Sequence, residues 1–136
     1  MSETNVITLR RILAFAAIVE VGTALLLMVD PAIVVTLLLG MELSGVGTLL
    51  GRCFGIALLA LGVACWPKGQ SAESGSPAFR GMLIYNVMIA LYLAYLGLAA
   101  HLGGLLLWPG AALHAAVALL LVWIWRGERR TTTIGK

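Results

Sequence analysis

Long apolar segments separated by short polar breaks dominate this chain of 136 residues. Four of them approach or reach the ~20 residues that a helix needs to cross a bilayer. The segments cover residues 11–29, 46–66, 80–101 and 105–126. Because only helices and closed barrels satisfy every backbone group in lipid, this pattern predicts an all-α, integral membrane four-helix bundle. One domain is expected over residues 1–136.

Shorter elements connect the predicted spans. Asp30 and Pro31 end the first span, since aspartate is a good N-cap and proline suits the first turn of a new helix. Residues 31–39 are apolar but too few to cross the bilayer, so they predict a short interfacial helix at the membrane surface. Residues 67–79 are rich in Gly, Ser and Pro, and they predict a flexible polar loop.

Composition supports the membrane interpretation. The chain is 61% hydrophobic and 11% charged, with a mean hydropathy of +1.02, whereas soluble domains are about half apolar and a quarter charged. Expected partners are therefore the lipid bilayer and molecules within it. The net charge of +3 is interpreted as a topology signal, and no nucleic-acid partner is expected.

The placement of basic residues predicts the orientation. If the N-terminus is cytoplasmic, every Lys and Arg except Arg52 falls on the cytoplasmic side, and the two outer connections carry Asp30 and Glu42. This is the positive-inside pattern of a multi-pass protein of a bacterial inner (plasma) membrane with both termini in the cytoplasm.

The second span carries regularly spaced glycines. Gly47, Gly51 and Gly55 recur every fourth residue, and Gly62 follows. Glycines at this spacing share one helical face and let a second backbone approach closely, which predicts a tight helix contact. The pattern leaves open whether that contact forms within one chain or between two.

A few polar side chains lie inside the spans, beside the small-residue face of their own helix. On the third span, Asn86 begins such a face, with Tyr85 beside it. From helical rise and depth we predict an intramembrane polar cluster in the outward-facing half of the bundle. Its predicted members are Glu20, Arg52, Tyr92 and His114. An arginine at mid-bilayer costs about 2.5–3.5 kcal/mol even on the lenient insertion scale, which a Glu20–Arg52 pair would offset.

Structural interpretations stand beside the functional one. A Glu20–Arg52 pair is as readily a pin that sets helix register as part of a pocket. Arg52 could instead reach the outer surface and meet Asp30 or Glu42. A single His114 on a small-residue face is more often hydrogen-bonded core than a ligand. Two histidines without matched spacing predict no metal site, and no cofactor can be named.

The second span carries the pattern R-x-x-G-x-x-L-x-x-L-G from Arg52 to Gly62. With the helix order, the short piece after the first span and the polar middle loop, it resembles the DoxX-like and uncharacterised small four-helix membrane proteins of bacteria. That resemblance implies the same four-helix fold. Some DoxX-type proteins are linked to quinone-dependent sulfur oxidation, but no motif in this sequence carries that activity over.

Two hypotheses of function follow. The sequence has no H-E-x-x-H, P-loop or G-x-S-x-G motif, so the first hypothesis is non-catalytic: an accessory or assembly subunit of a membrane complex, or a homo-oligomer. The alternative is a bundle that binds a quinone, lipid or other amphiphile, with a redox or transport role. Its binding residues would be Glu20, Arg52, Tyr92 and His114. A binding bundle needs a cavity beside these groups, whereas a pin needs none.

Overall fold

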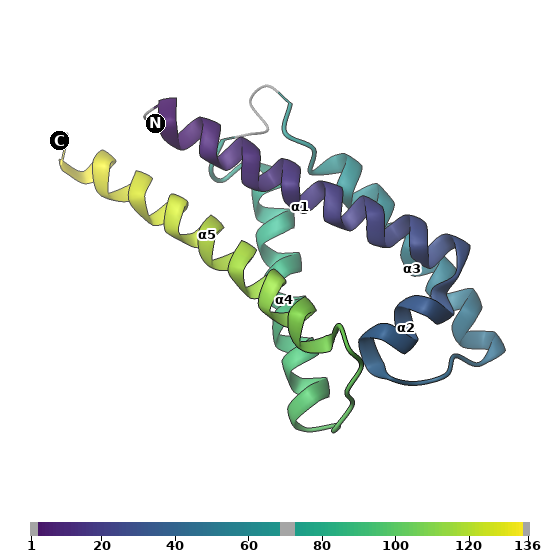
Figure 1. The fold of residues 1–136 in the computed structure, drawn as a ribbon. Helices are drawn as coiled ribbons and strands as arrows, with labels where there is room; N and C mark the ends of the chain where they lie inside the picture. The colour runs from purple at the N-terminus through teal and green to yellow at the C-terminus, as the bar shows by residue number, and fades with distance from the viewer. Residues whose placement is uncertain (1–2, 69–72, 135–136) are drawn as a thin grey trace.

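The computed structural model describes residues 3–68 and 73–134, with side chains described over 5–68 and 73–127. Within these residues the protein is all-helical, and Figure 1 shows the arrangement. The elements are α1 (Glu3–Val29), α2 (Pro31–Leu39), α3 (Gly45–Ala64), α4 (Pro77–Leu98) and α5 (Leu107–Ile134). All except α2 are long and apolar enough to span a membrane. The predicted all-α membrane bundle is confirmed, and the chain is a multi-pass membrane protein.

The helix ends differ from the predicted spans where polar residues continue a helix. Ser76 caps α4, because its Oγ accepts a hydrogen bond from the Phe79 N–H at 3.2 Å, and the helix therefore begins at Pro77 instead of residue 80. Helix α5 starts two residues later than predicted and continues past residue 126 to Ile134. The helix thus continues beyond the apolar part of the sequence, because residues 128–133 are Glu, Arg and Thr.

Local chemistry defines α2. The Asp30 carboxylate accepts hydrogen bonds from the N–H groups of Ala32 at 3.0 Å and Ile33 at 3.4 Å. At the other end Gly40 adopts a left-handed φ of 70°, and its N–H donates to the Thr36 carbonyl at 2.9 Å. Such a conformation is open to glycine and strained for most other residues. The predicted range 31–39 is the observed one.

Helix α2 is also joined to the connection between α4 and α5. The Leu106 N–H donates to the Leu37 carbonyl at 2.8 Å. A Cβ atom on Gly104 would overlap that same carbonyl, so the two backbones meet closely here. This contact holds α2 against the end of the bundle.

The long helices pack as two pairs, α1 along α3 and α4 along α5. Glycines of α3 make the first pair close: a Cβ atom on Gly55 would lie 2.9 Å from the Ala24 carbonyl oxygen, and one on Gly62 would lie 3.2 Å from that of Ala17. Gly51 faces Pro31 at the start of α2. Gly47 instead meets the side chain of Leu43 in its own segment. The close contact of the glycine face is therefore made within one chain.

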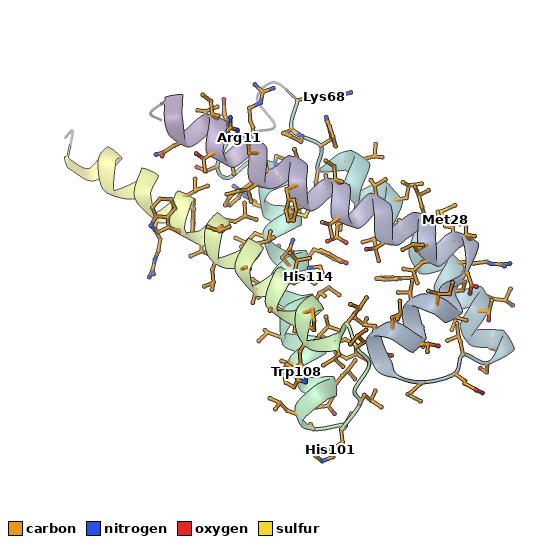
Figure 2. The ribbon with its side chains drawn as sticks, viewed as in Figure 1. Arg11, Met28, Lys68, His101, Trp108 and His114 are labelled. Atoms are coloured by element: carbon orange, nitrogen blue, oxygen red, sulfur yellow. The ribbon has the colours of Figure 1, made fainter. Side chains whose placement is uncertain are left out.

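Helix α1 joins the two pairs, because it contacts each of the other four helices. A large apolar core, which includes Leu13, Phe79 and Leu121, lies where α1, α4 and α5 meet. The start of α1, the end of α3, the start of α4 and the end of α5 lie at one end of the molecule (Figure 1). At this end Figure 2 shows Arg11 and Lys68, whereas His101 lies far from them at the opposite end.

Candidate functional site

Three helices bring polar side chains together in the interior of the bundle. Glu20 of α1 and Asn86 of α4 are the fully buried polar residues of the described chain, at 2% and 1% exposure. His114 of α5 joins them with a side chain that is 13% exposed. All three lie well inside the apolar spans of their helices, away from either end. Buried polar groups at this depth are costly unless they have hydrogen-bond partners.

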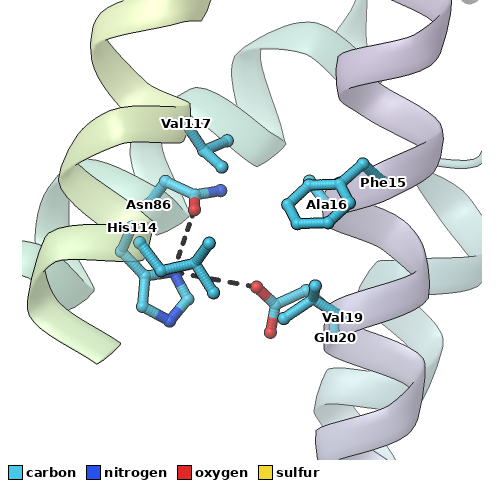
Figure 3. Close-up of a pocket in the computed structure, with 8 residues that line it drawn as sticks. Phe15, Ala16, Val19, Glu20, Asn86, His114 and Val117 are labelled. Carbon is cyan, nitrogen blue, oxygen red and sulfur yellow. Dashed lines mark hydrogen bonds and ion pairs between the residues drawn. The ribbon is translucent and has the colours of Figure 1, made fainter. Parts of the chain in front are cut away.

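Asn86 links α4 to α5 through its side chain. Its Nδ2 donates to the Met82 carbonyl one turn earlier in α4, at 2.8 Å. Its Oδ1 lies 2.9 Å from Nδ1 of His114 (Figure 3). Asn86 therefore has a donor and an acceptor satisfied, and it sets the position of the His114 ring.

Glu20 approaches the same ring from α1. Its Oε1 lies 3.8 Å from His114 Nδ1, which is too long for a hydrogen bond. Tyr85 of α4 completes the group: its ring packs edge-on against His114 with centroids 5.7 Å apart, and its hydroxyl lies near the Glu20 carboxyl group. We call Glu20, Tyr85, Asn86 and His114 the central polar cluster.

A partly open depression, which we call the pocket, adjoins the central polar cluster between α1, α4 and α5, and it encloses no space large enough for a water molecule. Its rim carries the partly exposed side chains Phe15, Val19 and Leu113, and its inner wall is more deeply buried. Figure 3 shows Glu20 and His114 facing one another across the space between α1 and α5. The complete lining is Phe15, Ala16, Val19, Glu20, Asn86, Leu113, His114 and Val117. The lining is apolar apart from Glu20, Asn86 and His114, a composition that small-molecule sites show in larger clefts.

Two of the four predicted site residues meet in this cluster, Glu20 and His114. Arg52 is exposed on α3, and no ion pair to it occurs among the residues that the structure describes. The predicted Glu20–Arg52 pair is therefore wrong, because the face of α3 that packs on α1 and on the start of α2 runs through Gly51 and Gly55. Arg52, one residue beyond Gly51, is turned about 100° away from it.

Tyr92 also lies outside the cluster. It is 57% exposed and stacks on Tyr95 with ring centroids 6.4 Å apart. Asn86 and Tyr85 occupy the place that Tyr92 was expected to take. An amide in the middle of an apolar span was the sequence signal for Asn86, since such a group requires an interior partner. Nothing in the spacing distinguished Tyr85 from Tyr92.

The cluster can form hydrogen bonds with a ligand, and it places one carboxyl group beside one imidazole. Within the described part of the chain, no set of three His, Cys, Asp or Glu residues is grouped as a metal site would require. No protein-family model, curated protein or solved structure matches this chain.

Proposed function

We propose that this membrane protein binds an amphiphile, such as a quinone or a lipid, in the pocket between α1, α4 and α5. The observation that supports this proposal is that Glu20 and His114 adjoin an apolar pocket inside the membrane-spanning helices. Polar groups at this depth are expensive, and where they occur they commonly mark substrate or ion pathways. The head group of the amphiphile would meet the cluster, and its apolar part would meet Phe15, Val19 and Leu113.

The arrangement of the cluster favours binding over a purely structural pin. A register pin made of two opposite charges would bring its partners into hydrogen-bond distance. Here Glu20 and His114 are 3.8 Å apart beside a pocket. Because the rim residues belong to helices that face lipid, the amphiphile would enter sideways from the membrane. The bound amphiphile would serve a redox or transport role.

The basic residues support the proposed location. Arg11 and Lys68 lie at the end of the molecule where α1 starts and α5 ends (Figure 2). Basic residues face the cytoplasm in inner-membrane proteins. We therefore propose a bacterial inner-membrane protein with its N- and C-termini in the cytoplasm.

Native mass spectrometry of protein extracted gently from its own membrane tests the binding function. Val19→Phe fills the pocket, whereas Ile18→Phe, at the neighbouring position, adds a similar side chain on a surface that is 58% exposed. We expect a reproducible small-molecule adduct on the wild type and on Ile18→Phe, and its loss from Val19→Phe. An adduct that persists unchanged on Val19→Phe, or no adduct on any of the three, would contradict the proposal.

A second candidate function, as an accessory subunit or homo-oligomer, is favoured by Arg52. This side chain is exposed within an apolar span and lacks an ion-pair partner in the described part of the chain. A carboxylate supplied by another subunit would offset the cost of about 2.5–3.5 kcal/mol for an arginine in this environment.

The neighbouring exposed residue, Cys53, provides the control for this second candidate. Arg52→Leu should convert a complex of fixed stoichiometry into lone chains, whereas Cys53→Leu should leave it intact. Lone chains in the wild type would exclude this candidate and leave the binding proposal unaffected.

A further inference from the structure

The orientation of the Asn86 amide determines what His114 can offer to a ligand. A backbone carbonyl only accepts hydrogen bonds, so the atom 2.8 Å from the Met82 oxygen must be the amide nitrogen of Asn86. The other amide atom, Oδ1, is then an acceptor directed at His114 Nδ1, 2.9 Å away. Nδ1 must therefore carry a proton, and its N–H donates a hydrogen bond to Asn86 Oδ1.

The distance between Glu20 and His114 indicates that the imidazole is neutral. An ionised imidazolium and a carboxylate in contact form a short hydrogen bond of about 2.7–2.9 Å. Glu20 Oε1 instead lies 3.8 Å from Nδ1, and the Nδ1 proton is directed to Asn86. A buried pair of charges without that hydrogen bond would not recover the cost of leaving water.

A neutral imidazole with its proton on Nδ1 has a lone pair on Nε2. No described residue forms a hydrogen bond with Nε2, and Figure 3 shows this nitrogen on the ring edge that faces away from Asn86. The edge-on contact with Tyr85 supports the ring in this orientation. His114, which lines the pocket, thus carries at Nε2 an acceptor for which the described residues provide no hydrogen-bond partner. An acceptor left unpaired on binding a ligand would weaken that binding.

We infer that the pocket selects amphiphiles whose head group carries a hydroxyl, because that hydroxyl can donate a hydrogen bond to Nε2 of His114. The inference rests on the proposed binding function and narrows its ligand class to alcohols, phenols and other hydroxylated heads, which include a quinol but exclude the oxidised quinone. Head groups that only accept hydrogen bonds, such as ethers and isolated carbonyls, leave the Nε2 lone pair buried without a donor.

The proton position on His114 can be measured without any ligand. His101 is the other histidine of the chain, and its exposed, left-handed backbone (φ 54°) accommodates asparagine. In a His101→Asn background, ¹⁵N NMR of histidine-labelled protein in nanodiscs reports His114 alone. We expect a protonated Nδ1 and an unprotonated Nε2 at neutral pH. A proton on Nε2, with or without one on Nδ1, would overturn the inference.

Ligand selectivity provides the second test, with 4-nonylphenol and its methyl ether, 4-nonylanisole, as matched probes. Binding to the protein in nanodiscs is compared at equal probe concentration in the lipid phase. We expect the phenol to bind about tenfold more tightly, the effect of one buried hydrogen bond. His114→Phe keeps a ring but removes the acceptor, so this preference should fall to about one.

Each outcome has a distinct meaning. Equal binding of both probes to the wild type overturns the hydroxyl inference and leaves amphiphile binding intact. Failure of both probes to bind counts against the hydroxyl inference and the proposed function together. A preference that survives in His114→Phe also overturns the inference, since it would have another source.

Discussion

The contact between Gly55 of α3 and the backbone of α1 provides a direct test of how the bundle is held together. A Cβ atom added at Gly55 would lie 2.9 Å from the Ala24 carbonyl oxygen, 2.9 Å from Met28 Cγ and 3.0 Å from Leu27 Cβ. Real Cβ contacts are almost never this short. Two of the three atoms belong to a backbone or begin a side chain, so they move only if α1 moves. Gly55→Ala therefore requires the α1–α3 pair to separate.

The expected magnitude follows from two opposing effects. Overpacking at a close contact costs about 1–3 kcal/mol. Replacing glycine with alanine inside a helix stabilises that helix by at most about 1 kcal/mol. The steric effect is larger, so we expect Gly55→Ala to lower the free energy of unfolding by about 1–2 kcal/mol. Such a change shifts the ratio of folded to unfolded protein by a factor of roughly 5–30.

A matched control is available on α1. Gly22 lies in the middle of that helix and has no atom within 4 Å of its added Cβ. Gly22→Ala should leave stability unchanged or raise it by up to about 1 kcal/mol. Unfolding by SDS in mixed micelles, followed by tryptophan fluorescence, measures both variants. If Gly55→Ala is as stable as Gly22→Ala, the close packing of α3 on α1 is refuted.

Three further perturbations address the cluster, the arginine and α2. Asn86→Leu should destabilise the bundle by about 1–3 kcal/mol, because it leaves His114 Nδ1 unpaired, and adding His114→Phe should recover much of this loss. A double-mutant cycle measured by SDS unfolding tests this, and zero coupling between the two positions would contradict the contact. Glu20→Leu and Arg52→Leu should be additive to within about 0.5 kcal/mol in the same assay, and strong coupling would indicate the ion pair that we exclude. Gly40→Ala should lower the free energy of unfolding by about 1–2 kcal/mol, because a φ of 70° disfavours a side chain and the new Cβ would lie 3.0 Å from a backbone oxygen. An unchanged midpoint of thermal unfolding would contradict this prediction.

Several features follow from local sequence and were predicted on that basis. Twenty or so apolar residues in a row must form a helix in lipid, since no other single segment satisfies its own backbone there. Asp30 and Pro31 start α2 through contacts that span only three residues, so its range was predictable. The C-terminal extension of α5 was missed because polar residues carry no periodic signal that separates a helix from a tail.

The grouping of the polar side chains depended on how the helices are rotated about their axes. Helical rise predicted similar depths in the membrane for Glu20, Arg52, Tyr92 and His114. Depth along the helix axis does not determine whether a side chain faces the interior of the bundle or the lipid. The close approach of Gly55 and Gly62 to α1 sets the rotation of α3 and leaves Arg52 exposed. A rotation of about 100° per residue separates an interior position from a lipid-facing one.

The amino-acid sequence by itself determined that this is a four-span, all-α membrane protein, because apolar length and backbone hydrogen bonding are properties of each segment alone. It also indicated that Glu20 and His114 need interior partners, since a polar group inside a span is costly, but the same reasoning placed Arg52 in the interior, where it does not lie. Only the tertiary structure decided that Glu20 meets Tyr85 and His114, and that Asn86 orients His114. These contacts join α1, α4 and α5, and they arise from side-chain packing among helices far apart in the chain.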